Sequence, residues 1–182
     1  MSNAPATYTP AQGRPTARKA PLYTAEERRR RDATKWTLVQ GILAPVQFLV
    51  FLCSVALIAR YMLFGVGLHA ATVSVVVKTL VLYVIMITGA IWEREVFGCY
   101  LFARAFFWED VVSFVVLALH TAYLLAVTYG WLSARGQMAL ALSAYVAYLV
   151  NATQFILKLR AARLVQRSEY SGPAAPVFGV PT

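Results

Sequence analysis

The chain has 182 residues, of which 59% are hydrophobic and 14% are charged, and its formal net charge is +9. This composition excludes an ordinary soluble domain and indicates an integral membrane protein. The positive charge does not indicate nucleic-acid binding, because the basic residues lie at the ends of apolar runs. The two cysteines, Cys53 and Cys99, lie in different contexts and predict neither a disulfide framework nor a metal site.

The N-terminal region divides into two polar segments. Residues 1–20 are predicted to be a disordered tail. Residues 21–34 form a basic juxtamembrane segment, and because no apolar stretch precedes it, a cleavable signal peptide is not expected. Thr24 and Glu27 have the spacing of a helix capping box, which predicts a short amphipathic helix at the membrane surface.

Four apolar runs follow, each near or above the ~20 residues that cross the hydrocarbon core of a bilayer. They cover residues 35–61, 69–97, 106–130 and 137–159 and predict an all-α fold, an integral membrane four-helix bundle within residues 35–165. The lysines and arginines near the ends of these runs place both termini in the cytoplasm. The proline-containing segment 166–182 is predicted to be a second disordered tail.

The run 106–130 carries ionisable side chains along its length, which makes it the default functional segment of a membrane protein. At about 100° per residue, Glu109, Ser113, His120 and Tyr123 share one helix face, and Asp110 flanks that face. Exposure of these polar side chains to lipid is energetically costly, so neighbouring helices are expected to cover them.

Glu93, Glu95, Glu109 and Asp110 converge at the inner membrane surface under this topology. Such a group favours the protonated form of one member, because like charges and an apolar setting both oppose ionisation. The alternative is that Glu93 and Glu95 are interfacial charges paired with the nearby arginines at positions 94 and 104. We favour this alternative for Glu95 and a functional role for Glu109 and Asp110.

Three polar residues lie deeper in the runs or on the last of them. His120 either bonds a tyrosine or a helix carbonyl, ligates a metal-bearing macrocycle, or shuttles protons, and the sequence leaves these alternatives open. Lys78 is expected to have a structural partner, with a substrate carboxylate as the alternative. Asn151 stands level with the carboxylates, where contact between helices is the more common role of an asparagine.

Common cofactor motifs are not found in the sequence. It has no G-x-G-x-x-G, no P-loop, no C-x-x-C and no H-E-x-x-H. Nucleotide-dependent chemistry and a protein-bound metal centre are therefore not favoured, and any reaction is expected to use acid–base groups.

Four long stretches carry a resemblance to a known family. They are PLYTAEERRRRDATKWTLVQGILAPVQFLVFL (21–52), GAIWEREVFG (89–98), FFWEDVVSFVVLALHTAYL (106–124) and NATQFILKLRAARL (151–164). Together they resemble the 3-vinyl (bacterio)chlorophyllide hydratase family of bacteriochlorophyll biosynthesis, also called 2-vinyl bacteriochlorophyllide hydratase. The similarity covers about residues 21–165. The longer N-terminal extension departs from the family pattern and leaves the catalytic part untouched.

The resemblance implies a hydro-lyase without a cofactor that adds water to the C3-vinyl group of chlorophyllide a or a bacteriochlorophyllide, giving a 3-(1-hydroxyethyl) group. It also implies a location in the cytoplasmic or intracytoplasmic membrane of a photosynthetic bacterium. The magnesium chlorin and the membrane are the implied partners, and other enzymes of the pathway are candidates for contact. Nucleic acid is not expected, and the oligomeric state is left open.

The resemblance brings no residue roles, so these are hypotheses from the chemistry. Hydration of a vinyl group needs a proton donor for the terminal carbon and a base that orients water. Glu109 or Glu93 is the expected acid, Asp110 the expected base, and His120 the candidate axial ligand of the substrate magnesium. The other expected substrate contacts have four roles. The aromatic residues expected to stack on the ring are Trp92, Phe106, Phe107 and Trp108. Tyr123 and Asn151 are expected to hold water or a ring carbonyl, and Lys158 or Arg104 to meet the propionate. Tyr148 and Gln154 lie on the same polar face.

Two other functions compete with this hypothesis. A non-catalytic tetrapyrrole-binding or pigment-delivery protein would use the same aromatic face and His120, but it would not need two carboxylates. A small transporter or proton-coupled membrane protein would need polar residues through the full membrane thickness. Apart from Lys78, the charged residues here cluster on the inner side, which disfavours the transporter.

Overall fold

The computed structural model describes residues 22–170, with side chains described through Val165. The predicted tail at 1–20 and residues 171–182 of the second predicted tail lie outside the described residues. Residues 166–170 continue the last helix.

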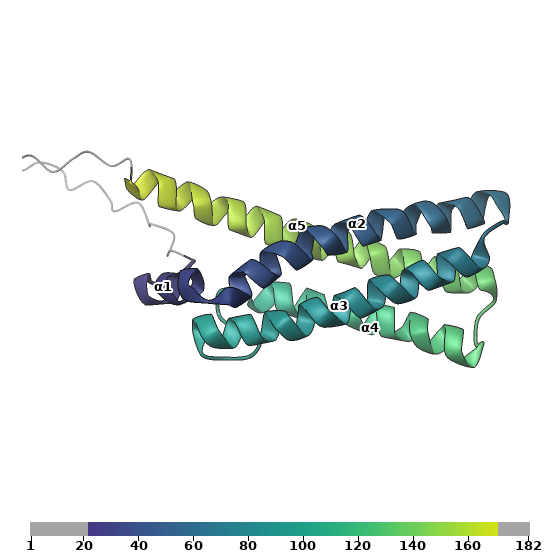
Figure 1. Ribbon diagram of the computed structural model, residues 1–182, viewed down its shortest axis with the longest axis horizontal. Helices are drawn as coiled ribbons and strands as arrows, with labels where there is room; N and C mark the ends of the chain where they lie inside the picture. Colours follow the sequence, from purple (N-terminus) through teal and green to yellow (C-terminus); the bar gives the residue numbers. More distant parts are fainter. Residues whose placement is uncertain (1–21, 171–182) are drawn as a thin grey trace, which may run out of the picture.

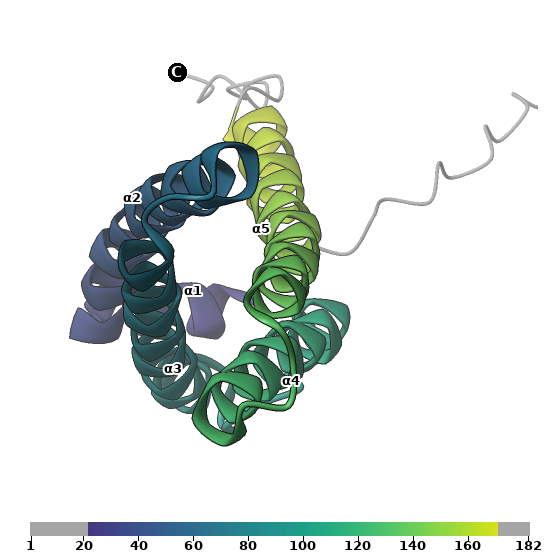
Figure 2. The same ribbon diagram turned by 90° about the vertical axis from the view of Figure 1, so that its right-hand side faces the viewer.

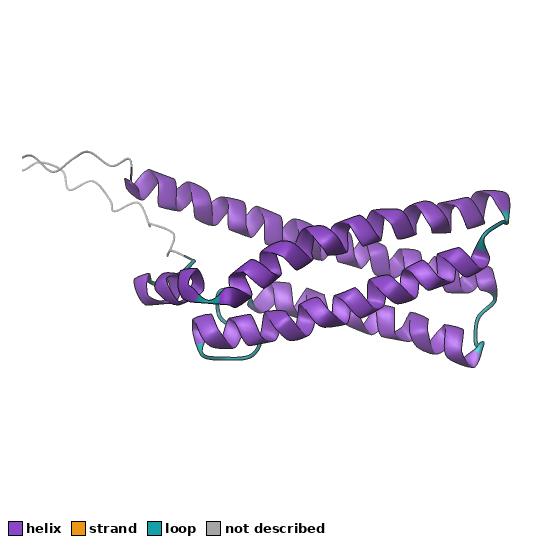
Figure 3. Ribbon diagram, in the orientation of Figure 1, coloured by secondary structure: helices purple, strands orange, loops and turns teal. Residues whose placement is uncertain are grey.

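The described residues form five helices joined by short loops (Figure 3), which confirms the predicted all-α fold. They are α1 (Ala25–Ala33), α2 (Lys35–Phe64), α3 (Leu68–Phe97), α4 (Phe107–Tyr129) and α5 (Ala134–Tyr170). Helices α2 to α5 are each long and apolar enough to cross a membrane, with mean hydropathy between 1.5 and 2.5 in their most apolar windows. The number of membrane-length helices therefore agrees with the sequence.

Helix α1 is the short helix that the sequence predicts after Thr24. Its capping box is complete: the Thr24 hydroxyl accepts from the Glu27 amide at 3.2 Å, and the Glu27 carboxylate accepts from the Thr24 amide at 2.7 Å. α1 packs against α3, and the C-terminal part of α5 lies at the same end of the bundle (Figure 1). This end is called the α1 end below.

The ends of α2, α3 and α4 fall within three residues of the predicted positions, but α5 differs. It was expected over 137–159, and it starts at Ala134 and continues to Tyr170. The prediction stopped where the apolar run gives way to charged residues. The following residues, 160–164, are alanine, arginine and leucine, which are strong helix formers, so the helix continues beyond its apolar part.

The bundle consists of two helical hairpins side by side, α2 with α3 and α4 with α5, as Figure 2 shows. Ile58, Val75, Val116 and Met138, one residue from each long helix, are fully buried in the core between them. Many large apolar side chains face outward on all four helices, including Leu49, Ile87, Val115 and Leu157. A surface of this kind is typical of contact with lipid.

Candidate active site

The loop between α3 and α4 closes the α1 end over two buried carboxyl groups. Glu93 near the end of α3 is 5% exposed, and Asp110 in the first turn of α4 is 4% exposed. The Phe102 amide donates to Asp110 Oδ2 at 2.7 Å, and the next amide, that of Ala103, donates to Glu93 Oε2 at 3.2 Å. Two successive backbone N–H groups thus each hold one of the two acids.

Phe102 has the backbone conformation that makes this possible. Its φ is 59°, in the left-handed region that bulky side chains rarely adopt. Its ring stacks on Phe114 at a centroid distance of 5.5 Å and contacts Phe107 at 5.6 Å. The ring contacts and the hydrogen bond from the Phe102 amide to Asp110 together hold this strained residue in place. Strained backbone of this kind is common at functional sites.

The Glu93 and Asp110 carboxyl groups are both buried and lie close enough to interact electrostatically. Burial and the like charge of a neighbour both disfavour the ionised form of a carboxyl group. The arrangement therefore favours a proton on one of the two groups, which would leave one proton donor and one proton acceptor side by side.

Glu109 has a different environment from its neighbour Asp110. It forms an ion pair with Lys158 of α5, with 2.5 Å between Lys158 Nζ and Glu109 Oε2. The Glu109 side chain is 9% exposed and that of Lys158 is 26% exposed. The Lys158 ammonium also lies 5.1 Å from the centre of the Phe106 ring. Glu109 thus has its own counter-ion.

Asn151 of α5 extends this polar region. Its side-chain amide donates to the Ser113 hydroxyl on α4 at 2.8 Å, so the helix-contact role that is usual for an asparagine is present. The Asn151 Oδ1 and Gln154 Oε1 atoms are buried without a hydrogen-bond partner among the described residues. These two acceptors can bind a donor that a ligand or water supplies.

The four aromatic residues expected to stack on a ring fall into two groups. Phe106, 2% exposed, and Trp92 lie 5.6 Å apart inside the α1 end, where Tyr23 and Phe155 complete an aromatic cluster. Phe107 and Trp108 instead face outward, at 44% and 70% exposure. Phe155 lies on the same polar face as Tyr148 and Lys158, whereas Tyr23 was not predicted to belong to the site. For Tyr23 a signal existed, since an apolar residue directly before an N-cap commonly packs back on the structure.

The exposed charges near the loop do not form the pairs considered as an alternative. Glu95 accepts a hydrogen bond from Thr34 at 3.1 Å, and Arg94 bonds to the Tyr100 hydroxyl. Glu93 is held by a backbone amide rather than by an arginine. Arg104 is exposed in the loop. The alternative that Glu93 and Glu95 pair with these arginines is therefore wrong.

Cys99 lies in the same loop and responds to the acids electrostatically. Cys99 is exposed, but partial desolvation in the loop raises the pKa of its thiol, and the nearby charges of Glu93 and Asp110 raise the pKa further. Among the described residues, no three His, Cys, Asp or Glu side chains are grouped so that they could hold a metal ion.

His120, Tyr123 and Tyr148 lie in the middle of the bundle, away from the carboxyl pair. His120 is fully buried, and its Nδ1 is 2.8 Å from the Val116 carbonyl oxygen. A carbonyl only accepts, so Nδ1 carries the hydrogen and Nε2 of the neutral ring keeps its lone pair. Nε2 has no partner among the described residues. His120 can therefore serve as a ligand or as a hydrogen-bond acceptor.

Four membrane-length helices with two buried carboxyl groups at one end define a class of all-helical protein. Within this class, residues 23–161 match the family model of 2-vinyl bacteriochlorophyllide hydratase. The chain is 61% identical over 156 residues to the 2-vinyl bacteriochlorophyllide hydratase of Rhodobacter capsulatus, covering 86% of this chain and 90% of that protein. It is also 61% identical over 154 residues to the protein of the same name from Cereibacter sphaeroides, covering 82% of this chain and 95% of that protein.

The chain belongs to the 2-vinyl bacteriochlorophyllide hydratase family, which confirms the resemblance drawn from the four stretches of sequence. No solved structure matches it.

Proposed function

We propose that this chain is a hydro-lyase that adds water across the C3-vinyl group of chlorophyllide a or a bacteriochlorophyllide, giving the 3-(1-hydroxyethyl) derivative. The observation that carries the proposal is the buried Glu93–Asp110 pair, held by successive amides, in a member of this family. A protein that only stores or delivers pigment has no need for two neighbouring buried acids.

Glu93 is the acid and Asp110 the base in this scheme. Asp110 lies in the first turn of α4, where the helix dipole favours a negative charge, whereas Glu93 lies close to the C-terminal end of α3, where it opposes one. Asp110 also accepts the shorter hydrogen bond from a backbone amide, 2.7 Å against 3.2 Å for Glu93. Glu109, already paired with Lys158, is the less suitable proton donor of the two acids considered.

The reaction then uses these two groups and one water molecule. Glu93 gives its proton to the terminal vinyl carbon, and the cation that forms at the inner carbon is delocalised into the macrocycle. Asp110 takes a proton from the attacking water as the water oxygen bonds to the inner carbon. Asp110 then passes this proton to the neighbouring Glu93, which restores both groups. The scheme uses no cofactor.

The remaining site residues position the substrate. Asn151 Oδ1 and Gln154 Oε1 accept hydrogen bonds from the attacking water. His120 Nε2 is the axial ligand of the substrate magnesium, and the Phe106 and Trp92 rings form an apolar wall for the macrocycle. The Lys158 ammonium, beside Phe106, is placed to meet an anionic edge of the substrate as well as Glu109.

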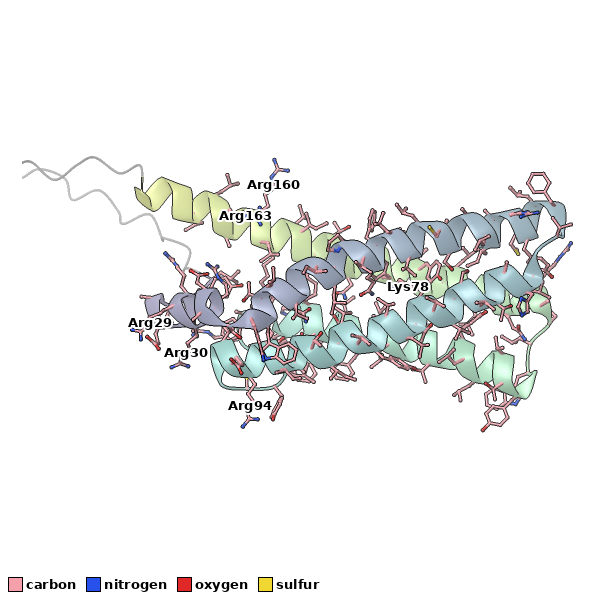
Figure 4. All side chains as sticks on the ribbon, viewed as in Figure 1. Arg29, Arg30, Lys78, Arg94, Arg160 and Arg163 are labelled. Carbon is pink, nitrogen blue, oxygen red and sulfur yellow. The ribbon has the colours of Figure 1, made fainter. Side chains whose placement is uncertain are left out.

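The α1 end faces the cytoplasm in this proposal, with both termini on that side. Figure 4 shows Arg29, Arg30, Arg94, Arg160 and Arg163 gathered at the α1 end. Positive side chains flank the cytoplasmic ends of membrane helices, so this end is the inner one. The outward-facing apolar side chains of α2 to α5 contact lipid, and a tetrapyrrole that partitions into the membrane reaches the site from there. The host membrane is the cytoplasmic or intracytoplasmic membrane of a photosynthetic bacterium.

The test is a conversion assay. Membranes from a non-photosynthetic host that expresses the chain are incubated with chlorophyllide a in ¹⁸O-labelled water, and pigments are separated by chromatography and mass. The expected product is heavier by one water and carries ¹⁸O in its new hydroxyl group. Folded protein that retains pigment but converts neither chlorophyllide a nor any vinyl bacteriochlorophyllide would contradict the proposal and favour a pigment-binding role.

A further inference from the structure

Lys78 is a fully buried lysine in the middle of the bundle that the proposed chemistry does not use. Its side chain lies on α3 at 0% exposure, and Figure 4 places it well away along the bundle from the labelled arginines of the α1 end. An uncompensated ammonium inside a membrane-length helix is costly, and such residues are commonly functional. The environment of Lys78 therefore decides whether it is structural.

The Lys78 ammonium lies against an aromatic face. Nζ lies 3.9 Å from the centre of the Tyr148 ring of α5, a cation–π contact. This contact uses none of the three N–H donors, and Nζ has no hydrogen-bond partner among the described residues. The described carboxylates lie on α1, at the end of α3 and at the start of α4, all at the α1 end. Among the described residues, Lys78 therefore has no carboxylate counter-ion beside it.

One more buried polar atom without a hydrogen-bond partner among the described residues lies near Lys78. It is His120 Nε2 on α4, and the two groups are close enough to interact electrostatically. Lys78 and His120 are both fully buried, so two helices present one cationic donor and one lone pair in the same part of the bundle.

A nearby network shows what a purely structural polar contact looks like in this bundle. The Tyr145 hydroxyl donates to Ser54 at 2.6 Å, and Ser54 bonds to Ser74 at 2.7 Å, which links α5, α2 and α3. Tyr145 also packs against His120, with 5.7 Å between ring centres. These hydroxyl groups satisfy one another and fix the helices, so Lys78 is not needed for that purpose.

We propose that Lys78 is a substrate-binding residue whose ammonium donates hydrogen bonds to an oxygen at the edge of the tetrapyrrole, while the ring metal sits at His120. The inference rests on the proposed function, because that function brings a tetrapyrrole into the bundle. The oxygen is a ring carbonyl if Lys158 holds the propionate, or the propionate carboxylate itself if Lys158 stays paired with Glu109 alone, since both kinds of oxygen accept from an ammonium. Lys78 then sets the position of the macrocycle along the bundle so that the vinyl group reaches the Glu93–Asp110 pair.

The test measures binding separately from chemistry. The full chain is purified in lipid nanodiscs and titrated with the C3-ethyl analogue of chlorophyllide a, which has no vinyl group to hydrate. Lys78→Met replaces the ammonium with an apolar side chain of similar length, and Lys35→Met is the control at an exposed lysine. We expect at least tenfold weaker binding for Lys78→Met, a raised KM with a smaller change in kcat, and no change for Lys35→Met.

Two further arms identify the oxygen without relying on the variant alone. If the acceptor is the ring carbonyl, its Raman stretch shifts on binding to the natural chain and not to Lys78→Met. If it is the carboxylate, the natural chain binds the free acid more tightly than its methyl ester, and Lys78→Met does not distinguish them. The Raman shift and the preference for the free acid can both be measured with the natural chain, even if the variant fails to fold.

The outcomes separate this inference from the proposed function. A natural chain that hydrates vinyl substrate, together with folded Lys78→Met that binds as tightly and gives the same spectrum, would overturn the inference alone. Bound analogue with the predicted dependence on Lys78, but no hydration of any vinyl substrate, would support the inference and overturn the hydratase.

Discussion

The carboxyl groups of Glu93 and Asp110 are held by successive backbone amides of a single loop, those of Ala103 and Phe102 respectively. Glu93 comes from the end of one hairpin and Asp110 from the start of the next. The loop therefore does more than connect two helices, because its amides set the distance between the two acids. The reaction that we propose depends on this arrangement.

Neutral amide variants of the pair should abolish conversion. Glu93→Gln removes the proton donor and Asp110→Asn removes the base, and each should lower the initial rate of product formation by about 100-fold or more, the usual contribution of general acid–base catalysis. Glu95→Gln is the control, because Glu95 is exposed on the same helix and bonds to Thr34. Equal losses in all three variants would mean that the assay reports folding rather than chemistry.

The loop geometry can be tested at Phe102 with two substitutions. Phe102→Gly keeps the amide and accepts the φ of 59°, so it should keep activity within several-fold despite the lost ring contacts. Phe102→Pro removes the N–H that Asp110 accepts from and cannot adopt a positive φ. It should lose most activity and about 1–3 kcal/mol of stability. The account fails if Phe102→Pro matches Phe102→Gly in rate and in thermal denaturation.

The sequence predicted the fold better than the site. Apolar runs of membrane length identified all four long helices, because length and hydropathy are properties of the segment itself. The helix face of Glu109, Ser113, His120 and Tyr123 was also predicted, and all four are buried.

The remaining features depend on which helix faces which. The sequence placed Glu93 and Asp110 at one level, but it could not show that a left-handed Phe102 would present two amides to them. The outward direction of Trp108 follows from tertiary packing, so it could not be predicted from an aromatic count.

The ion pair between Glu109 and Lys158 should contribute mainly to stability. Lys158→Met leaves Glu109 buried without a partner and should lower stability by about 1–3 kcal/mol, the cost of an unsatisfied buried group. The double variant Glu109→Gln/Lys158→Met should recover part of this loss, because no lone charge remains. Thermal denaturation of the two single variants and the double variant in detergent measures the coupling. Strictly additive effects would show that the two groups do not interact.

Cys99 offers a readout of the carboxyl pair that does not depend on substrate. In a Cys53→Ser background, the pH midpoint for alkylation of the exposed Cys99 should lie above that of a free thiol, since partial desolvation in the loop and the two acids both raise its pKa. Glu93→Gln/Asp110→Asn removes negative charge and should move the midpoint down, so alkylation at neutral pH becomes faster. An unchanged midpoint would place the acids too far from the loop.

The separate roles of Glu93 and Asp110 are tested most directly by deuterium exchange at the vinyl group. In deuterated water, Asp110→Asn keeps the proton donor, so it should exchange hydrogens of the terminal vinyl carbon through reversible protonation while forming no hydroxyethyl product. Glu93→Gln should do neither. Mass analysis of recovered chlorophyllide a gives both results from one incubation. Exchange that persists in Glu93→Gln, or hydration at the natural rate in Asp110→Asn, would contradict the assignment of acid and base.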